Sequence, residues 1–110
     1  MLLNGKLVAD TIEVHAGQAT RLRLINIRTE SLTELALEQN GVLVAWRVVA
    51  KDGAALPPYQ IRDRSATLVS SPGEIFDVEI APPHPGTMIL RYLGQTGDST
   101  TTRRAIIRAH

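Results

Sequence analysis

The sequence contains no cysteine among its 110 residues. Disulfide frameworks, thiolate zinc sites, iron–sulfur clusters and thiol nucleophiles are therefore excluded. Aromatic residues make up 4% of the chain and lie far apart, at Trp46, Tyr59, Phe76 and Tyr92, whereas a surface that stacks nucleic-acid bases needs closely placed aromatics. Long apolar runs are also missing, and none approaches the roughly 20 residues that cross a bilayer. We therefore expect no membrane span.

Charge of one sign is lacking as well. Twelve basic residues face eleven acidic ones, which leaves a formal net charge of +1 and gives no argument for a nucleic-acid partner. The hydrophobic share of 44% is ordinary for a globular protein, so intrinsic disorder is not expected. The length fits one domain over residues 1–110, given about 100–200 residues per domain.

The first residues do not have the basic, apolar and small-residue segments of a secretory signal peptide. Leu2-Leu3-Asn4-Gly5 instead favours a short strand that runs into a turn. Because the sequence enters structure at its second residue, we expect the chain to be a piece of a longer protein rather than a complete cytoplasmic one.

Alternation of apolar and polar residues with a period of two dominates the chain and indicates strands. Strands are predicted over residues 11–15, 20–24, 35–38, 42–49, 66–70, 75–80, 87–93 and 103–108. Residues 42–49 are mostly apolar, as expected of a strand buried on both faces, and residues 94–102 are predicted to form a polar loop. About eight or nine strands separated by turns predict an all-β fold, an antiparallel sandwich of two sheets.

Three local signals refine this prediction. At Ile25-Asn26-Ile27 the apolar positions move to the opposite face, which indicates a bulge or a change of sheet. Asn40-Gly41 is a strong hairpin signal. The segment 28–37 is a helix-like candidate that is too short to change the fold class.

Histidine is the remaining side chain that could ligate copper or zinc. His15, His84 and His110 are far apart in the sequence, without the short H-x-H spacing typical of such sites. We interpret all three as solvent-facing. A blue-copper centre also requires a cysteine thiolate, which this chain lacks.

Nucleophilic and phosphate-binding motifs are absent too. None of the serines considered as nucleophiles lies in a G-x-S-x-G elbow; these are Ser65, Ser70, Ser71 and Ser99. No glycine-rich phosphate motif is present, and no carboxylate pair is favoured by its spacing. We predict no catalytic, cofactor-binding or metal-ligating residue in this chain.

Arginines supply ten of the twelve basic residues. Arg21 and Arg23 share a strand face, as Arg62 and Arg64 do if that segment is extended, whereas the adjacent Arg103 and Arg104 point to opposite faces. Salt-bridged strand surface is the favoured interpretation, and contact with a partner is the alternative. Asp77, between Phe76 and Val78, either faces solvent or accepts hydrogen bonds, and we favour bonds from a loop or an arginine.

An ordered set of motifs carries a resemblance to a known family. The set begins with Leu3-Asn4-Gly5, Ala16-Gly17-Gln18 and Arg21-Leu22-Arg23-Leu24-Ile25-Asn26, and continues with Val48-Val49-Ala50-Lys51-Asp52-Gly53, Leu56-Pro57-Pro58, Ser71-Pro72-Gly73-Glu74-Ile75-Phe76-Asp77-Val78, Ile89-Leu90-Arg91-Tyr92 and Ala105-Ile106-Ile107. In this order the chain resembles the cupredoxin-like domains of multicopper oxidases, and most of all the middle domain of three-domain enzymes. The resemblance implies a Greek-key β-sandwich.

The resemblance also implies a role. The histidine patterns of the copper-carrying domains, H-x-H and a histidine- and cysteine-rich stretch, are not present here. A structural domain is therefore expected, which spaces and orients neighbouring copper-bearing domains of the same chain and holds no cofactor itself. The parent would oxidise a substrate, reduce dioxygen, carry copper in its flanking domains and act in the periplasm or after secretion.

Two other functions stay open at this point. Some relatives of the family have lost every metal ligand, so the chain is alternatively a copper-free scaffold or a protein-binding module. A small hydrolase on a β-sandwich is the third possibility. An isolated sandwich that exposes an apolar patch is also expected to favour a homodimer.

Overall fold

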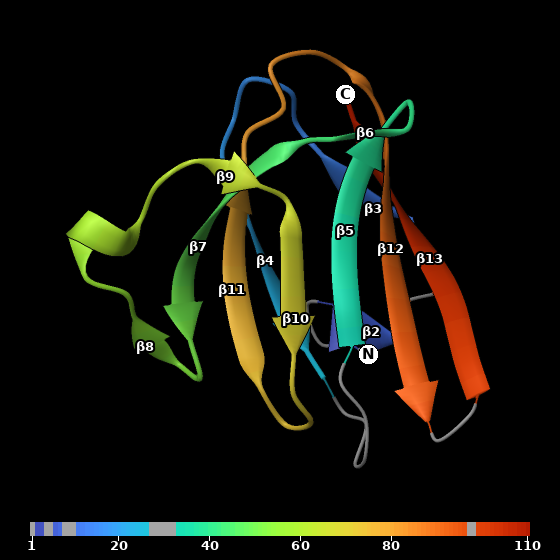
Figure 1. Ribbon diagram of the computed structural model, residues 1–110. Coiled ribbons are helices and arrows are strands. Elements are labelled where there is room, and N and C mark those ends of the chain that lie inside the picture. The colour runs from blue at the N-terminus through green and yellow to red at the C-terminus, as the bar shows by residue number, and fades with distance from the viewer. Residues whose placement is uncertain (1, 4–5, 8–10, 27–32, 97–98) are drawn as a thin grey trace.

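The structure is a computed structural model that describes residues 2–3, 6–7, 11–26, 33–96 and 99–110. These residues form strands arranged in two sheets, together with one short 3-10 turn, η1 (Pro58–Gln60). Figure 1 shows the sheets side by side, with η1 on a lobe at the left. None of the described residues lies in a helix with the length and apolar character needed to cross a membrane.

The first sheet, called sheet I here, has β4 and β11 at its centre. Its order is β2 (Lys6–Leu7), β1 (Leu2–Leu3), β4 (Thr20–Ile25), β11 (Ile75–Ile80), β7 (Ala45–Lys51) and β8 (Ala54–Ala55), and β9 (Arg64–Ser65) also pairs with β7. The second sheet, sheet II, has the order β10 (Thr67–Ser70), β5 (Thr33–Gln39), β12 (Gly86–Thr96), β13 (Ser99–Ala109) and β3 (Ile12–Val14), and β6 (Val42–Leu43) also pairs with β5. The predicted two-sheet, all-β sandwich is confirmed.

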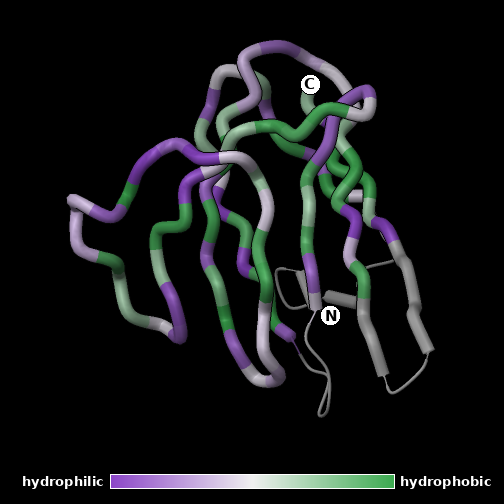
Figure 2. Tube along the Cα trace, viewed as in Figure 1, coloured by the Kyte–Doolittle hydropathy of each residue, from purple (hydrophilic) through white to green (hydrophobic). Residues whose placement is uncertain are grey.

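The predicted alternation places apolar side chains between the sheets. In β4, Leu22 and Leu24 are each 1% exposed, whereas Arg21 and Arg23 face outward. The hydropathy colours change along the strands in the same way (Figure 2). Period-two patterning thus determines which face of each strand is buried.

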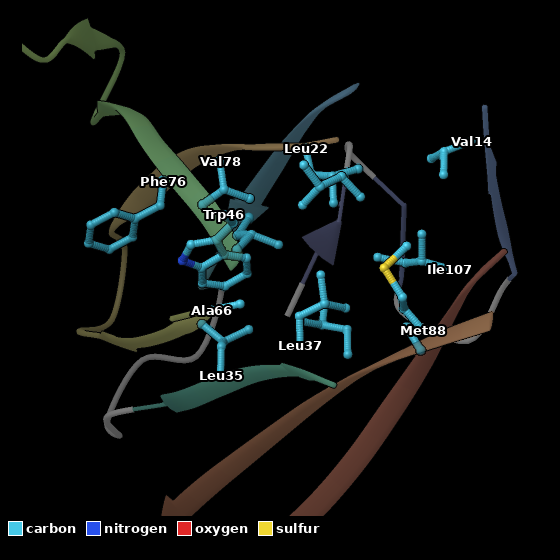
Figure 3. Close-up of a cluster of buried hydrophobic side chains, with 14 of the residues drawn as sticks. Val14, Leu22, Leu35, Leu37, Trp46, Ala66, Phe76, Val78, Met88 and Ile107 are labelled. Carbon is cyan, nitrogen blue, oxygen red and sulfur yellow. The ribbon is translucent and has the colours of Figure 1, made fainter. Parts of the chain in front are cut away.

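The core lies where the two sheets face each other. Trp46 and Val78 from sheet I lie opposite Leu35 and Leu37 from sheet II (Figure 3), and all four are at most 2% exposed. Phe76, 9% exposed, lies to one side of this cluster. Met88 and Ile107 extend the same core along sheet II. Close packing of these side chains fixes the relative position of the sheets.

The prediction of one strand over residues 42–49, buried on both faces, is wrong. The chain leaves sheet II after β6 and enters sheet I at β7, so Val44 lies at a crossing between the sheets. In β7, Trp46 and Val48 are buried while Ala45 and Arg47 are exposed. The apolar run therefore reflects a crossing and a single buried face.

The predicted polar loop over residues 94–102 is also wrong. β12 continues to Thr96 and β13 begins at Ser99, and the two strands pair from Gly86 with Ala109 to Thr96 with Ser99. The hairpin is extended by the threonine-rich start of β13, which pairs with residues 93–96 of β12, since threonine is well suited to a pleated strand. Polarity alone made this segment resemble a loop.

Two further differences concern the ends of strands. β3 runs parallel to β13 in an otherwise antiparallel sheet II, because Val14 O accepts from His110 N at 3.0 Å and pairs the two segments. Residues 33–37 of the helix-like candidate belong to β5, and its earlier part lies outside the described residues.

The change of sheet expected near Asn26 is confirmed, because β4 belongs to sheet I and β5 to sheet II. Ile27 lies outside the described residues. The β-bulge in sheet I lies elsewhere, between Asp77 and Val78 where β11 pairs with β7. This bulge places Ala50 beside Asp77 on the outer face of the sheet.

Candidate functional site

The outer face of sheet I carries a buried carboxylate held by two arginines. The register places Asp77 opposite Arg23 and Glu79 opposite Arg21. Arg23 donates from Nε to Asp77 Oδ1 at 2.9 Å and from a terminal nitrogen to Oδ2 at 3.1 Å. Arg21 donates to Oδ2 from Nε at 3.0 Å and from a terminal nitrogen at 2.7 Å. We call these three residues the Asp77 cluster.

The Asp77 cluster is asymmetric in exposure. The side chain of Asp77 is 3% exposed, whereas those of Arg21 and Arg23 are 57% and 54% exposed. The hydrogen bond from Arg23 lowers the pKa of Asp77 against the opposing effect of desolvation, and Arg21 lowers it further. The expectation that Asp77 accepts bonds from a loop or an arginine is confirmed, and the donors are two arginines that hold the carboxylate ionised.

A second polar network ties the end of β4 to the turn between β10 and β11. Asn26, 1% exposed, donates from Nδ2 to Ser70 O at 3.0 Å. Its own backbone N–H donates to Glu74 O at 3.1 Å, and its carbonyl accepts from Gly73 N at 2.8 Å. Asn26 and the turn that contains Gly73 and Glu74, which belong to two of the motifs quoted above, therefore meet at one end of the sandwich. Their contacts hold the end of β4 against this turn.

The turn at Asp52 joins the same end. Asp52 Oδ1 accepts from Ile75 N at 2.9 Å, and Asp52 N donates to Ile75 O at 2.7 Å. Lys51, the preceding residue, pairs with Glu74 at 2.8 Å. The hydrogen bond from Lys51 lowers the pKa of Glu74, and the hydrogen bond from the backbone N–H of Ser71 lowers it further.

The three histidines are all exposed, as predicted. The backbone brings their segments to one end, since Ala16 N donates to His110 O and Gly17 N donates to Pro82 O, each at 2.8 Å. The ring of His110 contacts the carboxylate of Glu13. Within the described part of the chain, no three histidine or acidic side chains form a group suited to a metal ion.

The serines take structural positions where their side chains are described. Ser70 is buried and its hydroxyl donates to Ser71 O at 3.4 Å, while Ser71 N donates to the carboxylate of Glu74. Ser65 is exposed in β9. The side chain of Ser99 lies outside the described residues.

The remaining described arginines mostly form salt-bridged strand surface, as favoured. The pairs are Arg47 with Asp63 at 2.6 Å, Arg91 with Glu38 at 3.4 Å and Arg108 with Glu13 at 3.7 Å. Arg104 is exposed, and the side chain of Arg103 lies outside the described residues. Exposed pairs of this kind contribute little to stability.

Arg62 and Arg64 behave differently. Both line a pocket of about 460 Å³ together with Lys51 and with residues from the η1 segment and from strands of both sheets. Neither arginine has an ion-pair partner among the described residues. Asp63, which lies between them, turns its carboxylate to Arg47 instead. We call this cavity the Tyr59 pocket.

The floor of the Tyr59 pocket is apolar. Leu56, Leu68 and Phe76 line it from three different segments, and Tyr59 on η1 stands at its rim with 80% of its surface exposed. Lys51 Nζ lies 5.6 Å from the centre of the Phe76 ring. The pocket therefore combines an apolar base with three cationic groups and has no lining carboxylate among the described residues.

A larger neighbouring pocket of about 590 Å³ has mixed charge. Glu34 lines it together with Arg64 and Arg91, and Arg91 is already paired with Glu38. Arg64 and Leu68 line both pockets, so the two adjoin. Of the two, only the larger pocket has a carboxylate among its described lining residues.

Sequence reasoning singled out Arg62 and Arg64 but missed the Tyr59 pocket. Its other members come partly from β7, β10 and β11 and partly from the irregular segment around η1, and no periodicity indicates that these distant segments face one another. The diproline at 57–58 was a usable signal, because proline fixes the backbone that presents Tyr59.

Exposed apolar side chains lie on several different elements. Val42 and Leu43 are on β6, Val69 is on β10, and Ile106 is on β13. The homodimer stays a prediction.

Comparison with known proteins supports the fold. No family model and no curated protein matches the chain. A solved structure described as a "Crystal structure of multicopper oxidase" superposes with a TM-score of 0.62 at 15% sequence identity, over 90% of this chain and 32% of that one.

The sandwich is therefore a cupredoxin-like β-sandwich. A multicopper oxidase contains a region of this fold, and the chain spans about a third of the length of that solved structure. At 15% identity the match shows the fold, whereas function is decided by the site.

Proposed function

We propose that this chain is a structural, copper-free cupredoxin-like domain of a multicopper oxidase, most like the middle domain of three-domain enzymes. It spaces and orients the copper-bearing domains on either side. The observation that carries this proposal is the superposition of 90% of the chain on 32% of a multicopper oxidase. That share is the size of one domain among three of similar length.

The residues of this chain do not fit a copper centre. The chain has no cysteine, which a blue-copper centre requires. His15, His84 and His110 are exposed, and His110 contacts Glu13. In this proposal the copper, the oxidation of substrate and the reduction of dioxygen belong to the flanking domains of a periplasmic or secreted parent.

The two polar networks suit a spacer. The Asp77 cluster joins β4 to β11 across the outer face of sheet I. The Asn26 network joins the end of β4 to the turn that leads into β11. Such cross-strand bonds hold an outer surface in one shape, which a domain that orients its neighbours needs.

Titration of the 110-residue chain with Cu(II) tests the copper-free part of the proposal. Electron paramagnetic resonance and visible absorption should show weak, non-stoichiometric binding that disappears in the triple variant His15→Gln, His84→Gln, His110→Gln. One tightly bound equivalent with a blue band or a strong tetragonal signal overturns the proposal.

The coding sequence on both sides of this segment tests the spacer role. The proposal predicts flanking cupredoxin-like domains, one with an H-x-H pattern and one with a histidine- and cysteine-rich stretch. Flanking domains without those ligands assign the chain to a copper-free scaffold or protein-binding module instead.

A further inference from the structure

We propose that the Tyr59 pocket binds a small organic anion that joins a planar apolar body to a carboxylate. This inference goes beyond the structural role and does not depend on it. It rests on the uncompensated cations, the apolar floor and the size of the pocket.

Two arginines of the pocket have no ion-pair partner among the described residues. Arg62 and Arg64 lie two residues apart and line one pocket, while the intervening Asp63 is drawn to Arg47 at 2.6 Å. That bond lowers the pKa of Asp63, so its carboxylate stays ionised and paired with Arg47. The guanidinium groups of Arg62 and Arg64 are left with hydrogen-bond donors that match a carboxylate in geometry and charge.

The third cation is partly engaged. Lys51 pairs with Glu74 at 2.8 Å and lies over the ring of Phe76. Because its ammonium group is already bonded to Glu74, Lys51 adds positive charge near the floor of the pocket but offers the ligand no free hydrogen-bond donor. The arginines are the groups expected to contact the carboxylate directly.

The apolar body of the ligand would lie on Leu56, Leu68 and Phe76, with Tyr59 alongside. An aromatic ring packs well against Phe and Tyr, in offset or edge-to-face arrangements. Tyr59 has no packing role that requires it at the rim, since it is 80% exposed.

The size of the pocket favours a free small molecule over a macromolecular surface. Its volume of about 460 Å³ falls in the range of roughly 300–1,000 Å³ typical of small-molecule sites. Convergent polar groups over an apolar base are the usual composition of such sites.

The experiment is a ¹H–¹⁵N NMR titration of the 110-residue chain with 2-naphthoate. Saturable shifts should be confined to the backbone amides of residues 51, 56, 59–64, 68 and 76, since Pro57 and Pro58 have no N–H. The neutral analogue 2-naphthylmethanol has the same ring system but no charge. Its affinity should be lower than that of 2-naphthoate by a factor of about ten or more.

Variants of the two arginines test whether they bind the carboxylate of 2-naphthoate. Arg62→Gln and Arg64→Gln should each weaken 2-naphthoate binding about tenfold, the scale of one charged hydrogen bond. Arg104→Gln, an exposed arginine on β13 without an ion-pair partner among the described residues, is the matched control and should leave binding unchanged. All three positions are exposed, so the remaining amide spectrum should keep its folded pattern.

Three results would overturn the proposal. The first is non-saturable shifts spread over the surface, and the second is equal affinity for the neutral analogue. The third is a response to an acidic peptide without aromatic rings but none to 2-naphthoate, which would assign the arginines to a protein partner.

Discussion

Asp77 is a buried carboxylate on a central strand of sheet I, and its side chain is 3% exposed. A carboxylate in the middle of a strand is unfavourable unless its oxygens are hydrogen-bonded, because burial removes its water. Arg21 and Arg23 supply four donor contacts between 2.7 and 3.1 Å while their own side chains stay half exposed. The cost of desolvation therefore falls mainly on the aspartate, and the arginines offset it.

Asp77→Asn should lower the free energy of unfolding at neutral pH by about 2 kcal/mol, the scale of hydrogen bonds to a charged group. It should also flatten the acid side of the stability profile. The pKa of Asp77 is lowered in the folded state, so its stabilisation is present above the unfolded pKa of about 3.9 and is lost as pH falls through the folded value.

The measurement is urea unfolding followed by the fluorescence of Trp46, the single tryptophan, at a series of pH values from neutral to acid. Asp63→Asn is the matched control, because this aspartate also pairs with an arginine but is 68% exposed. Its effect at neutral pH should be smaller. Wild-type and Asp77→Asn profiles that run parallel into acid would contradict the role given to Asp77.

Asn26→Ala should lower the free energy of unfolding by about 1–3 kcal/mol, because the variant leaves the buried carbonyl of Ser70 without its donor. Gln18→Ala, at an exposed turn position, is the control and should change stability by less than about 0.5 kcal/mol. Thermal unfolding measured by circular dichroism compares the two. Equal melting temperatures would show that the Asn26 bond contributes nothing.

At this scale the sequence predicts residues in regular strands better than residues in loops. Arg21, Arg23 and Asp77 lie in alternating segments, so the face on which each side chain lies follows from a period of two. The pairing of β4 with β11, which brings the arginines to Asp77, does not. Arg62 and Arg64 lie beside an irregular segment, and they lack an ion-pair partner among the described residues because Asp63 reaches Arg47 in β7. A contact between distant segments leaves no periodic signal.

Turns are the elements whose chemistry is most local. Asp52 and Gly53 have φ values of 51° and 83°, and both therefore occupy the left-handed region. A Cβ at Gly53 would meet nothing within 4 Å, so a substitution there is opposed by backbone conformation alone. Glycine adopts this region without the penalty that other residues meet.

Gly53→Ala should therefore lower the free energy of unfolding by about 1 kcal/mol. Asp52→Asn is the control, since asparagine tolerates the same conformation and keeps an oxygen for Ile75 N. Urea unfolding of both variants gives the comparison. A neutral Gly53→Ala would show that the turn relaxes away from its positive φ.

Element boundaries were predictable where pattern and burial agree. β11 spans Ile75–Ile80 as predicted, because β4 pairs with it along its whole length while β7 pairs with its middle part on the other side. The strands of the β12–β13 hairpin are longer than predicted, because the polar residues predicted to form a loop pair with each other across the two strands. The crossing at Val44 was missed because an apolar run does not reveal which sheet it faces.

At the scale of the whole molecule, stability depends on the packing of apolar side chains between the two sheets. Leu37 is 0% exposed in the core, whereas Leu43 is 42% exposed on β6. Leu37→Ala should lower the free energy of unfolding by about 3 kcal/mol, because it removes buried methyl groups and leaves a cavity. Leu43→Ala, the same substitution at a half-exposed site, should cost about 1 kcal/mol or less.

Guanidinium unfolding of these two leucine variants measures the difference directly. Similar losses at both positions would mean that the sheets do not pack over Leu37 as Figure 3 shows. The sandwich itself was predictable from sequence because its strands alternate.

A structure of the longer protein that contains this segment is the most direct test of the proposed role. The account predicts this sandwich between two copper-bearing domains, with every copper ligand supplied by those domains. Copper coordinated by His15, His84 or His110 would contradict it, and so would a parent in which no cupredoxin-like domain adjoins this one.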